Sequence, residues 1–209
     1  MRWFPLTKIA ILGSGGHTRS SINLLLNYFD SRDIGIYDNS FVEDQQEIIN
    51  SIPLIGSIND IESSQDIFLS IGDNNVRKKY FLQFKNQIIR NTAFHSDSLQ
   101  EKDIALGAAN QVFAHSYINS QVIIGDNNII NTGAIIEHEA IVGNHNHISI
   151  GAKICGRSTI SNMCLIGAGA VILDKLSICD NVIIGAGSVV IRDINDAGTY
   201  VGSPAKRVK

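Results

Sequence analysis

The sequence predicts two domains, a small parallel α/β domain followed by a parallel β-helix, and two observations carry this prediction. The first part of the chain alternates short apolar runs with segments of helical periodicity, which is typical of α/β domains. From residue 106 to residue 190, an aliphatic residue instead recurs at every sixth position. A period of six fits neither a helix nor a half-buried strand, and it indicates a hexapeptide-repeat β-helix.

The composition of the 209 residues is that of an ordinary folded protein, with 44% hydrophobic residues, 18% charged residues and a net charge of −3. Without a basic excess, nucleic acid is not expected as the main partner. No apolar run reaches the length of a membrane span, and residues 9–12 are too short for a secretion signal. Cys155, Cys164 and Cys179 are odd in number and lack C-x-x-C spacing, so we expect packing residues in a reducing, cytoplasmic protein.

The N-terminal domain opens with an apolar run, residues 8–12, that ends in the glycine loop Gly13-Ser14-Gly15-Gly16-His17. Apolar residues at helical spacing follow over residues 20–29, so the pattern predicts strand, loop and helix. Backbone N–H groups at a helix N-terminus suit a phosphate or pyrophosphate. The loop lacks the third glycine of the dinucleotide fingerprint, which disfavours a nicotinamide cofactor. A tight turn without a ligand is the alternative.

Two further strands are predicted at residues 34–37 and 67–71, and a helix at residues 75–84. The first of these strands ends in Asp38-Asn39 and the second in Gly72-Asp73-Asn74. Because ligands bind beyond the carboxyl ends of parallel strands, we expect ligand-binding groups in these loops and in the glycine loop.

The rest of the N-terminal half is less informative. A fourth strand is predicted at residues 88–93, and residues 41–64 show no pattern to which a function can be assigned. The polar segment 94–103 suggests a link between domains, so we predict domains at residues 1–97 and 98–209.

The six-residue ladder contains fifteen aliphatic residues: Leu106, Val112, Ile118, Ile124, Ile130, Ile136, Val142, Ile148, Ile154, Ile160, Ile166, Ile172, Ile178, Ile184 and Val190. If three hexads close one coil, fifteen hexads predict about five coils whose interior the aliphatic residues fill. The positions two before them are mostly small and are expected at crowded corners. Gly107, Gly125 and Gly143 recur at the coil period, as do Gly167 and Gly185 on another edge, where we expect turns with positive φ.

Reactive groups on such a domain must point outward, because its interior is filled. His138, His145 and His147 fall within ten residues, and His138 is flanked by Glu137 and Glu139. A carboxylate beside an imidazole fixes its tautomer and favours its protonated form, which suits a general base. A metal site built from the three histidines is the competing interpretation, which their expected places on different edges disfavour.

Several motifs resemble the family of sialic acid O-acetyltransferases and sugar-nucleotide N-acetyltransferases of the PglD and NeuD type. They span most of the chain in the family's order: GSGGH (13–17), IGDN (71–74), RKK (77–79), NTGAIIEHE (131–139), HNHISIGAK (145–153) and VGSPAK (201–206). The resemblance implies a Rossmann-like nucleotide-sugar-binding domain, a left-handed β-helix and a homotrimer. It also implies that acetyl-CoA, the co-substrate, binds between neighbouring chains, and it implies no metal.

The same resemblance implies roles for individual residues. His138 matches the family's general base and Glu139 the acid that supports it. Matches to acetyl-CoA contacts are His147, Gly156, Ala168 and Ala186, of which Gly156 is expected to face the oxyanion. Matches to nucleotide-sugar contacts are Gly15, Gly16, His17, Asp38, Asn39 and Gly72. At the positions of Asn39 and Thr18, many relatives have a different residue.

The leading hypothesis is an acetyl-CoA-dependent N-acetyltransferase that acts on a UDP- or dTDP-linked 4-amino-4,6-dideoxy sugar. Such a product would enter a surface glycan, such as O-antigen or lipopolysaccharide, or a glycoprotein sugar. Two alternatives remain open from the sequence, O-acetylation of a sialic acid and a non-catalytic trimeric partner of a sugar-synthesis enzyme.

Overall fold

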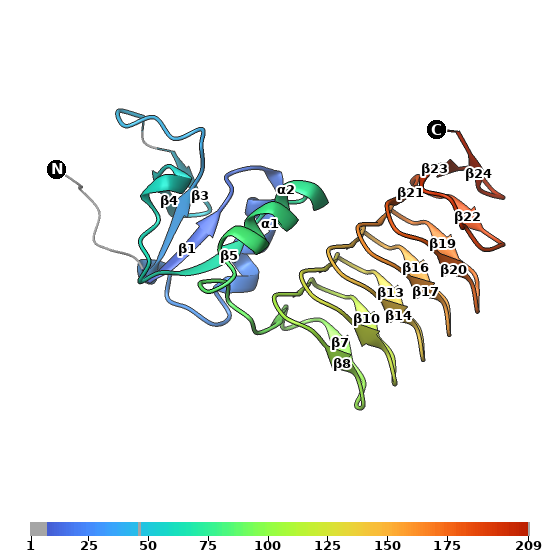
Figure 1. The fold of residues 1–209 in the computed structure, drawn as a ribbon. Helices are drawn as coiled ribbons and strands as arrows, with labels where there is room; N and C mark the ends of the chain where they lie inside the picture. Colours follow the sequence, from blue (N-terminus) through green and yellow to red (C-terminus); the bar gives the residue numbers. More distant parts are fainter. Residues whose placement is uncertain (1–7, 46, 209) are drawn as a thin grey trace. The chain divides into compact units, whose positions relative to one another are not determined.

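The computed structural model describes residues 8–45 and 47–208, which fall into two compact units, Met1–Ile89 and Arg90–Lys209. Figure 1 shows an α/β unit and a stack of short strands that forms a parallel β-helix. Both predicted fold classes are confirmed.

The N-terminal unit is built on one sheet with the order β3-β4-β2-β1-β5. Its strands are β1 (Ile9–Leu12), β2 (Ile34–Tyr37), β3 (Ile48–Ile49), β4 (Ile52–Gly56) and β5 (Asp66–Leu69), all parallel except β3. Its helices are α1 (Gly16–Leu25) and α2 (Asn74–Gln83), with short 3-10 helices η1 (Ser31–Asp33) and η2 (Ile58–Asp60). All four residues of both β1 and β2 are buried, as expected for parallel strands covered on both faces.

Two expectations for this unit change. The segment without a readable pattern contains β3, β4 and η2, because a hairpin of buried and half-buried residues there adds to the sheet. The fourth strand predicted at residues 88–93 is wrong: Ile88 makes only an isolated bridge to Ile67, and Ala93 already belongs to the β-helix.

The β-helix consists of three sheets. The first contains β6 (Ala93–Phe94), β9 (Gln111–Val112), β12 (Ile129–Ile130), β15 (His147–Ile148), β18 (Leu165–Ile166), β21 (Val182–Ile184), β23 (Gly198–Val201) and the antiparallel β24 (Lys206–Arg207). The second contains β7 (Leu99–Gln100), β10 (Tyr117–Ile118), β13 (Ile135–Ile136), β16 (Lys153–Ile154), β19 (Val171–Ile172) and β22 (Val189–Val190). The third contains β8 (Ala105–Leu106), β11 (Ile123–Ile124), β14 (Ile141–Val142), β17 (Thr159–Ile160) and β20 (Ser177–Ile178).

A coil is one strand from each sheet, and five coils are complete from β6 to β20. A sixth is formed by β21, β22 and an isolated bridge between Ile178 and Ile194. The repeat therefore starts two strands before Leu106, at Ala93–Phe94, and so before the boundary expected at residue 97. The sequence pattern hides these two strands, because Gln100 occupies a ladder position without being aliphatic.

The ladder fills the interior as predicted. All its members from Val112 to Val190 are at most 2% exposed, and Leu106 packs against them. The small residues at the corners are also buried, among them Ala134, Ala152 and Ala170. The β-helix core is therefore a continuous column of aliphatic side chains.

The corner glycines have a different role from the one expected. Positive φ recurs every six residues from Asp103 to Gly187, but Gly107, Gly125, Gly143, Gly167 and Gly185 are not among these positions. A Cβ on Gly143 would lie 2.6 Å from the carbonyl oxygen of Ser161 in the next coil. These glycines allow coils to stack closely, so the prediction of positive φ at them was wrong.

Buried asparagines join successive coils. The backbone N–H of Asn128 donates to Asn110 Oδ1 and that of Asn146 to Asn128 Oδ1, each at 2.8 Å. The Asn128 amide also donates to Asn110 Oδ1 at 3.1 Å and to the carbonyl oxygen of Gly143 at 2.9 Å. These asparagines thus satisfy polar groups inside a corner that water does not reach.

We expect Asn128→Ala to lower the free energy of unfolding by about 2–4 kcal/mol, because it leaves several buried polar groups without partners. Chemical denaturation measures the change. Asn195→Ala, at an exposed position of the same unit, is the matched control and should change stability by less than about 0.5 kcal/mol. Equal stability of the two variants would contradict a structural role for the buried asparagines.

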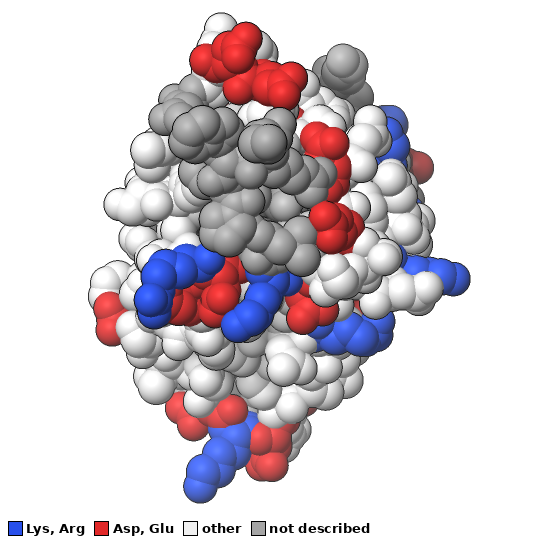
Figure 2. All heavy atoms as spheres, turned by 90° about the vertical axis from the view of Figure 1, so that its left-hand side faces the viewer, with Lys and Arg blue, Asp and Glu red and all other residues white. Residues whose placement is uncertain are grey.

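The charged side chains show no segregation by sign on the face in view in Figure 2, where acidic and basic groups lie next to one another. This distribution agrees with the absence of a basic excess. Within residues 8–45 and 47–208, no helix is both long enough and apolar enough to cross a membrane.

Candidate active site

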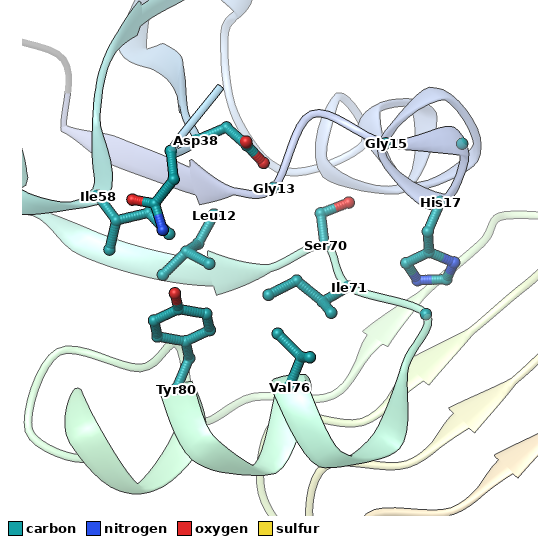
Figure 3. Close-up of a pocket in the computed structure, with 13 residues that line it drawn as sticks. Leu12, Gly13, Gly15, His17, Asp38, Ile58, Ser70, Ile71, Val76 and Tyr80 are labelled. Atoms are coloured by element: carbon teal, nitrogen blue, oxygen red, sulfur yellow. The ribbon is translucent and has the colours of Figure 1, made fainter. Parts of the chain in front are cut away.

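A pocket of about 390 Å³ lies at the carboxyl ends of β1, β2 and β5 (Figure 3). The three predicted loops meet there. The pocket is lined by all six residues expected to contact a nucleotide sugar, Gly15, Gly16, His17, Asp38, Asn39 and Gly72. Leu12, Ile58, Val76 and Tyr80 add apolar or aromatic surface that sequence reasoning did not assign.

The glycine loop leaves room for a ligand. Gly15 is the N-cap of α1, and the first turn of this helix carries no acidic side chain. A Cβ on Gly15 or Gly16 would meet no atom within 4 Å, so packing does not require glycine at either position. The N-terminus of α1 and this open space suit a phosphate group.

Asp38 ties two of the loops together. Its Oδ2 accepts a hydrogen bond from the Ser14 N–H and its Oδ1 accepts one from the Ser40 N–H, both at 2.9 Å. A carboxylate has about four acceptor sites, so Asp38 can also accept a hydroxyl of a bound ribose or sugar.

Two buried side chains, Arg77 and Thr18, hold the loops from behind. Arg77 is fully buried and donates to the carbonyl oxygens of Ile71 and Gly72 at 3.2 and 3.1 Å. Burial lowers the pKa of Arg77 to about 10, so it remains charged at neutral pH. The Thr18 hydroxyl donates to the carbonyl oxygen of Gly13 at 2.8 Å. Thr18 therefore supports the glycine loop.

His138 and Glu139 form a pair at the corner between β13 and β14, which we name the His138 corner. Their Nδ1 and Oε1 atoms lie 3.2 Å apart. Since a carboxylate only accepts, Nδ1 carries the proton and Nε2 of the neutral ring has its lone pair free. No residue in the described part of the chain hydrogen-bonds Nε2, so this atom is available to take a proton.

Glu137, the other acidic neighbour, is engaged elsewhere, because one of its carboxylate oxygens accepts a hydrogen bond from Asn119 Nδ2 at 2.6 Å. Of the two predicted flanking carboxylates, only Glu139 supports the imidazole directly.

The next two coils place Gly156 and Asp174 in the same column as His138, at the coil period of eighteen residues. A Cβ on Gly156 would lie 2.7 Å from both Cε1 and Nε2 of His138, and 3.1 Å from Asp174 Oδ1. The imidazole thus occupies the space of the missing side chain. Arg157 Nη2 contacts Asp174 Oδ1 and Oδ2 at 3.1 and 2.9 Å. Sequence reasoning missed Asp174 and Arg157, although counting the coil period from His138 finds Asp174.

The other two histidines lie away from His138. His145 is buried, with Nδ1 2.8 Å from Asn127 Nδ2. His147 lies on β15 in the first sheet, with Nε2 3.1 Å from Asn131 Nδ2. Among the residues that the structure describes, no group of three or more His, Cys, Asp or Glu side chains could hold a metal ion. The histidines are therefore three separate features.

Ala168 and Ala186 occupy a different corner, between the first and second sheets. They are exposed and lie one coil apart, and the Gly187 N–H donates to the Ala168 carbonyl oxygen at 2.8 Å. Of the four predicted acetyl-CoA contacts, only Gly156 adjoins His138 within one chain.

Comparison with known proteins supports both units. Residues 8–84 match the PglD N-terminal domain, and residues 157–192 match the bacterial transferase hexapeptide family model of six repeats. The search of curated proteins gave no match.

Solved structures of similar fold cover nearly the whole chain. PerB from Caulobacter crescentus, in complex with CoA and GDP-perosamine, is 27% identical with a TM-score of 0.87, over 98% of this chain and 99% of that one. The acetyltransferase domain of PglB from Neisseria gonorrhoeae FA1090, in complex with acetyl coenzyme A, is 26% identical with a TM-score of 0.85, over 98% and 100%. A histidine-to-asparagine mutant of perosamine N-acetyltransferase from Caulobacter crescentus, with CoA and GDP-perosamine, is 26% identical with a TM-score of 0.72, over 98% of each chain.

Proposed function

We propose that the chain transfers the acetyl group of acetyl-CoA to an amino group of a nucleotide-linked sugar. The match to the PglD N-terminal domain and to bacterial transferase hexapeptide repeats supports this proposal, as do the similar structures with CoA or acetyl-CoA. The observation that carries the proposal is the His138–Glu139 pair, which leaves Nε2 free on a fold whose similar structures contain CoA or acetyl-CoA. The N-terminal pocket supplies a separate place for the nucleotide part of the acceptor.

In the proposed mechanism the amino nitrogen attacks the thioester carbon and a C–N bond forms. His138 Nε2 takes a proton from that nitrogen, and Glu139 stabilises the resulting imidazolium through Nδ1–H. The C–S bond then breaks, and CoA leaves as the thiolate. Gly156 N–H has no partner among the described residues, which suits its proposed role as a donor to the oxyanion.

The finer assignment is also a proposal. We propose a 4-amino-4,6-dideoxy sugar on a UDP or dTDP carrier as the acceptor, in surface-glycan or glycoprotein sugar synthesis in the cytoplasm. We further propose a homotrimer in which His138 of one chain meets the acetyl-CoA contacts His147, Ala168 and Ala186 of another. The separate corners on which these residues lie support that arrangement.

The test is a thiol-release assay with acetyl-CoA and a panel of UDP-, dTDP- and GDP-linked 4-amino sugars, with free sialic acid as the alternative acceptor. The expected result is release of CoA thiol with at least one nucleotide amino sugar and acetylation of its nitrogen, confirmed by mass spectrometry. Turnover with sialic acid alone would favour O-acetylation, and no turnover with any acceptor would favour a non-catalytic role.

The protein's own thiols should interfere little with this assay. Burial raises the pKa of Cys164 to about 11, and desolvation also raises the pKa of both Cys155 and Cys179. Because the thiolate is the reactive form, these groups should react slowly near neutral pH.

We expect Gly16→Asp to abolish nucleotide binding without unfolding the protein. A carboxylate in the first turn of α1 repels a phosphate but is favourable for the helix itself. Differential scanning fluorimetry with the accepted nucleotide sugar measures the effect, since a ligand at 100 times its Kd stabilises the native state by about 2.7 kcal/mol. Gly16→Ala, whose Cβ meets no atom within 4 Å, is the control and should retain most of the shift. A full shift in the Asp variant would place the phosphate elsewhere.

A further inference from the structure

A second carboxylate, that of Asp174, lies near His138, the proposed base. It lies on the side of Nε2 and not on the side of Nδ1, which Glu139 Oε1 contacts. A Cβ atom on Gly156 would lie 2.7 Å from His138 Nε2 and 3.1 Å from Asp174 Oδ1. The two atoms are therefore no more than about 6 Å apart, and glycine leaves no side chain at the point between them. Nε2 is the atom to which the acceptor nitrogen must come.

Arg157 is the ion-pair partner of this carboxylate. Its Nη2 contacts both oxygens of Asp174, at 3.1 and 2.9 Å. One nitrogen occupies part of the carboxylate's acceptor capacity and leaves further lone pairs free. The side chains of Arg157, Asp174 and His138 are each 43% exposed, so an acceptor can reach the carboxylate. Such exposed pairs are only weakly bound to each other.

The chemistry of the proposed reaction gives this carboxylate a use. When an amine attacks a thioester, its nitrogen becomes positively charged as the C–N bond forms, until His138 takes the proton. A hydroxyl that loses its proton as it attacks develops much less positive charge. A carboxylate within about 6 Å of the base stabilises the first transition state more than the second.

We propose that Asp174 is a specificity-determining residue that selects amine over hydroxyl acceptors, and that its ion pair with Arg157 is not required for this role. This inference rests on the proposed N-acetyltransferase function. It gives a role to one member of an ion pair that is otherwise an exposed contact between two coils, and it identifies the acceptor class by its charge.

The experiment compares Asp174→Asn and Arg157→Gln in the full chain, with acetyl-CoA and the nucleotide amino sugar that the unmodified protein accepts. Asp174→Asn is expected to lower kcat/KM for the amine about three- to tenfold, with the acetyl-CoA Kd unchanged. Because the effect is Coulombic, the loss should shrink as ionic strength rises. Arg157→Gln keeps a hydrogen-bond donor but removes the positive charge, so its kcat/KM should equal or exceed that of the unmodified protein. Asp196→Asn, at an exposed position of the same unit, controls for the change in net charge.

The possible results distinguish a charge effect of Asp174 from a structural role of the ion pair and from failure of the proposed function. A loss in Asp174→Asn alone, reduced by salt, supports the proposal. Equal losses in both variants mean that the pair is merely structural, and no loss in Asp174→Asn overturns the role. A loss in Arg157→Gln alone also overturns it. If the unmodified protein turns over no amine acceptor, the proposed function fails instead. Melting temperatures identify any variant that fails to fold. If Asp174→Asn does not fold, the comparison is made between Asp174→Glu, which retains the charge, and Asp174→Gln, which removes it.

Discussion

Replacing His138 by alanine is expected to lower turnover by about 10²–10⁴-fold, the usual contribution of a general base. The variant keeps the backbone groups and coil stacking of the His138 corner, and the side chain is half-exposed, so the protein should fold. Binding of acetyl-CoA should be nearly unchanged, because the base acts on the acceptor nitrogen. Steady-state thiol release measures the first effect and isothermal titration with CoA the second.

The control for this prediction is an exposed histidine at another corner of the β-helix. His115 is exposed and lies between β9 and β10. His115→Asn should retain full turnover, whereas His138→Asn should be as impaired as the alanine variant. Undiminished turnover in both His138 variants would remove this residue from the mechanism and leave the identity of the base open.

The β-helix was predictable because one physical requirement repeats along the chain. Each ladder residue, such as Ile136 or Ile154, must be buried in its coil, and this requirement leaves a period in the sequence. The prediction failed where another interaction replaced the repeated one. Gln100 hides the first two strands of the first coil, and the stacking of Gly143 on Ser161 explains a glycine that had been assigned to positive φ.

The pocket of the N-terminal unit was predictable in outline for a different reason. Parallel strands bring their carboxyl ends to one edge, so the loops after β1, β2 and β5 had to meet. The side chains that shape the pocket were harder to find. Arg77 and Thr18 donate to backbone carbonyl oxygens five residues before them, and Thr18 also to that of Ser70 in another loop. Such contacts leave no period in the sequence.

The His138 corner combines both situations. Glu139 follows His138 directly in the sequence and could be assigned as its partner, and the distance of 3.2 Å between them supports that assignment. Gly156 was expected to act through its N–H group alone. The structure adds a steric role, because the imidazole of His138 lies where a side chain would be.

This steric role leads to the second large effect. Gly156→Ala is expected to lower turnover by about 10²-fold while changing the melting temperature by only a few degrees. The new Cβ would lie 2.7 Å from Cε1 and Nε2 of His138, whereas ordinary contacts begin near 3.4 Å. The imidazole is the movable group, so the ring shifts and the backbone stays. A displacement approaching 1 Å at a reacting group can cost about 10²-fold in rate. Steady-state kinetics and thermal unfolding of the variant measure the two quantities.

A double-mutant cycle distinguishes this explanation from a role in the oxyanion site alone. Alanine keeps the backbone N–H, so a residue that acts only through that group should tolerate the change. If Gly156 acts by seating the imidazole, Gly156→Ala should cause no further loss in a His138→Ala background, since the two sites are then coupled. Additive losses would mean that Gly156 contributes independently of the ring, and full activity of Gly156→Ala would show that the imidazole does not need this space.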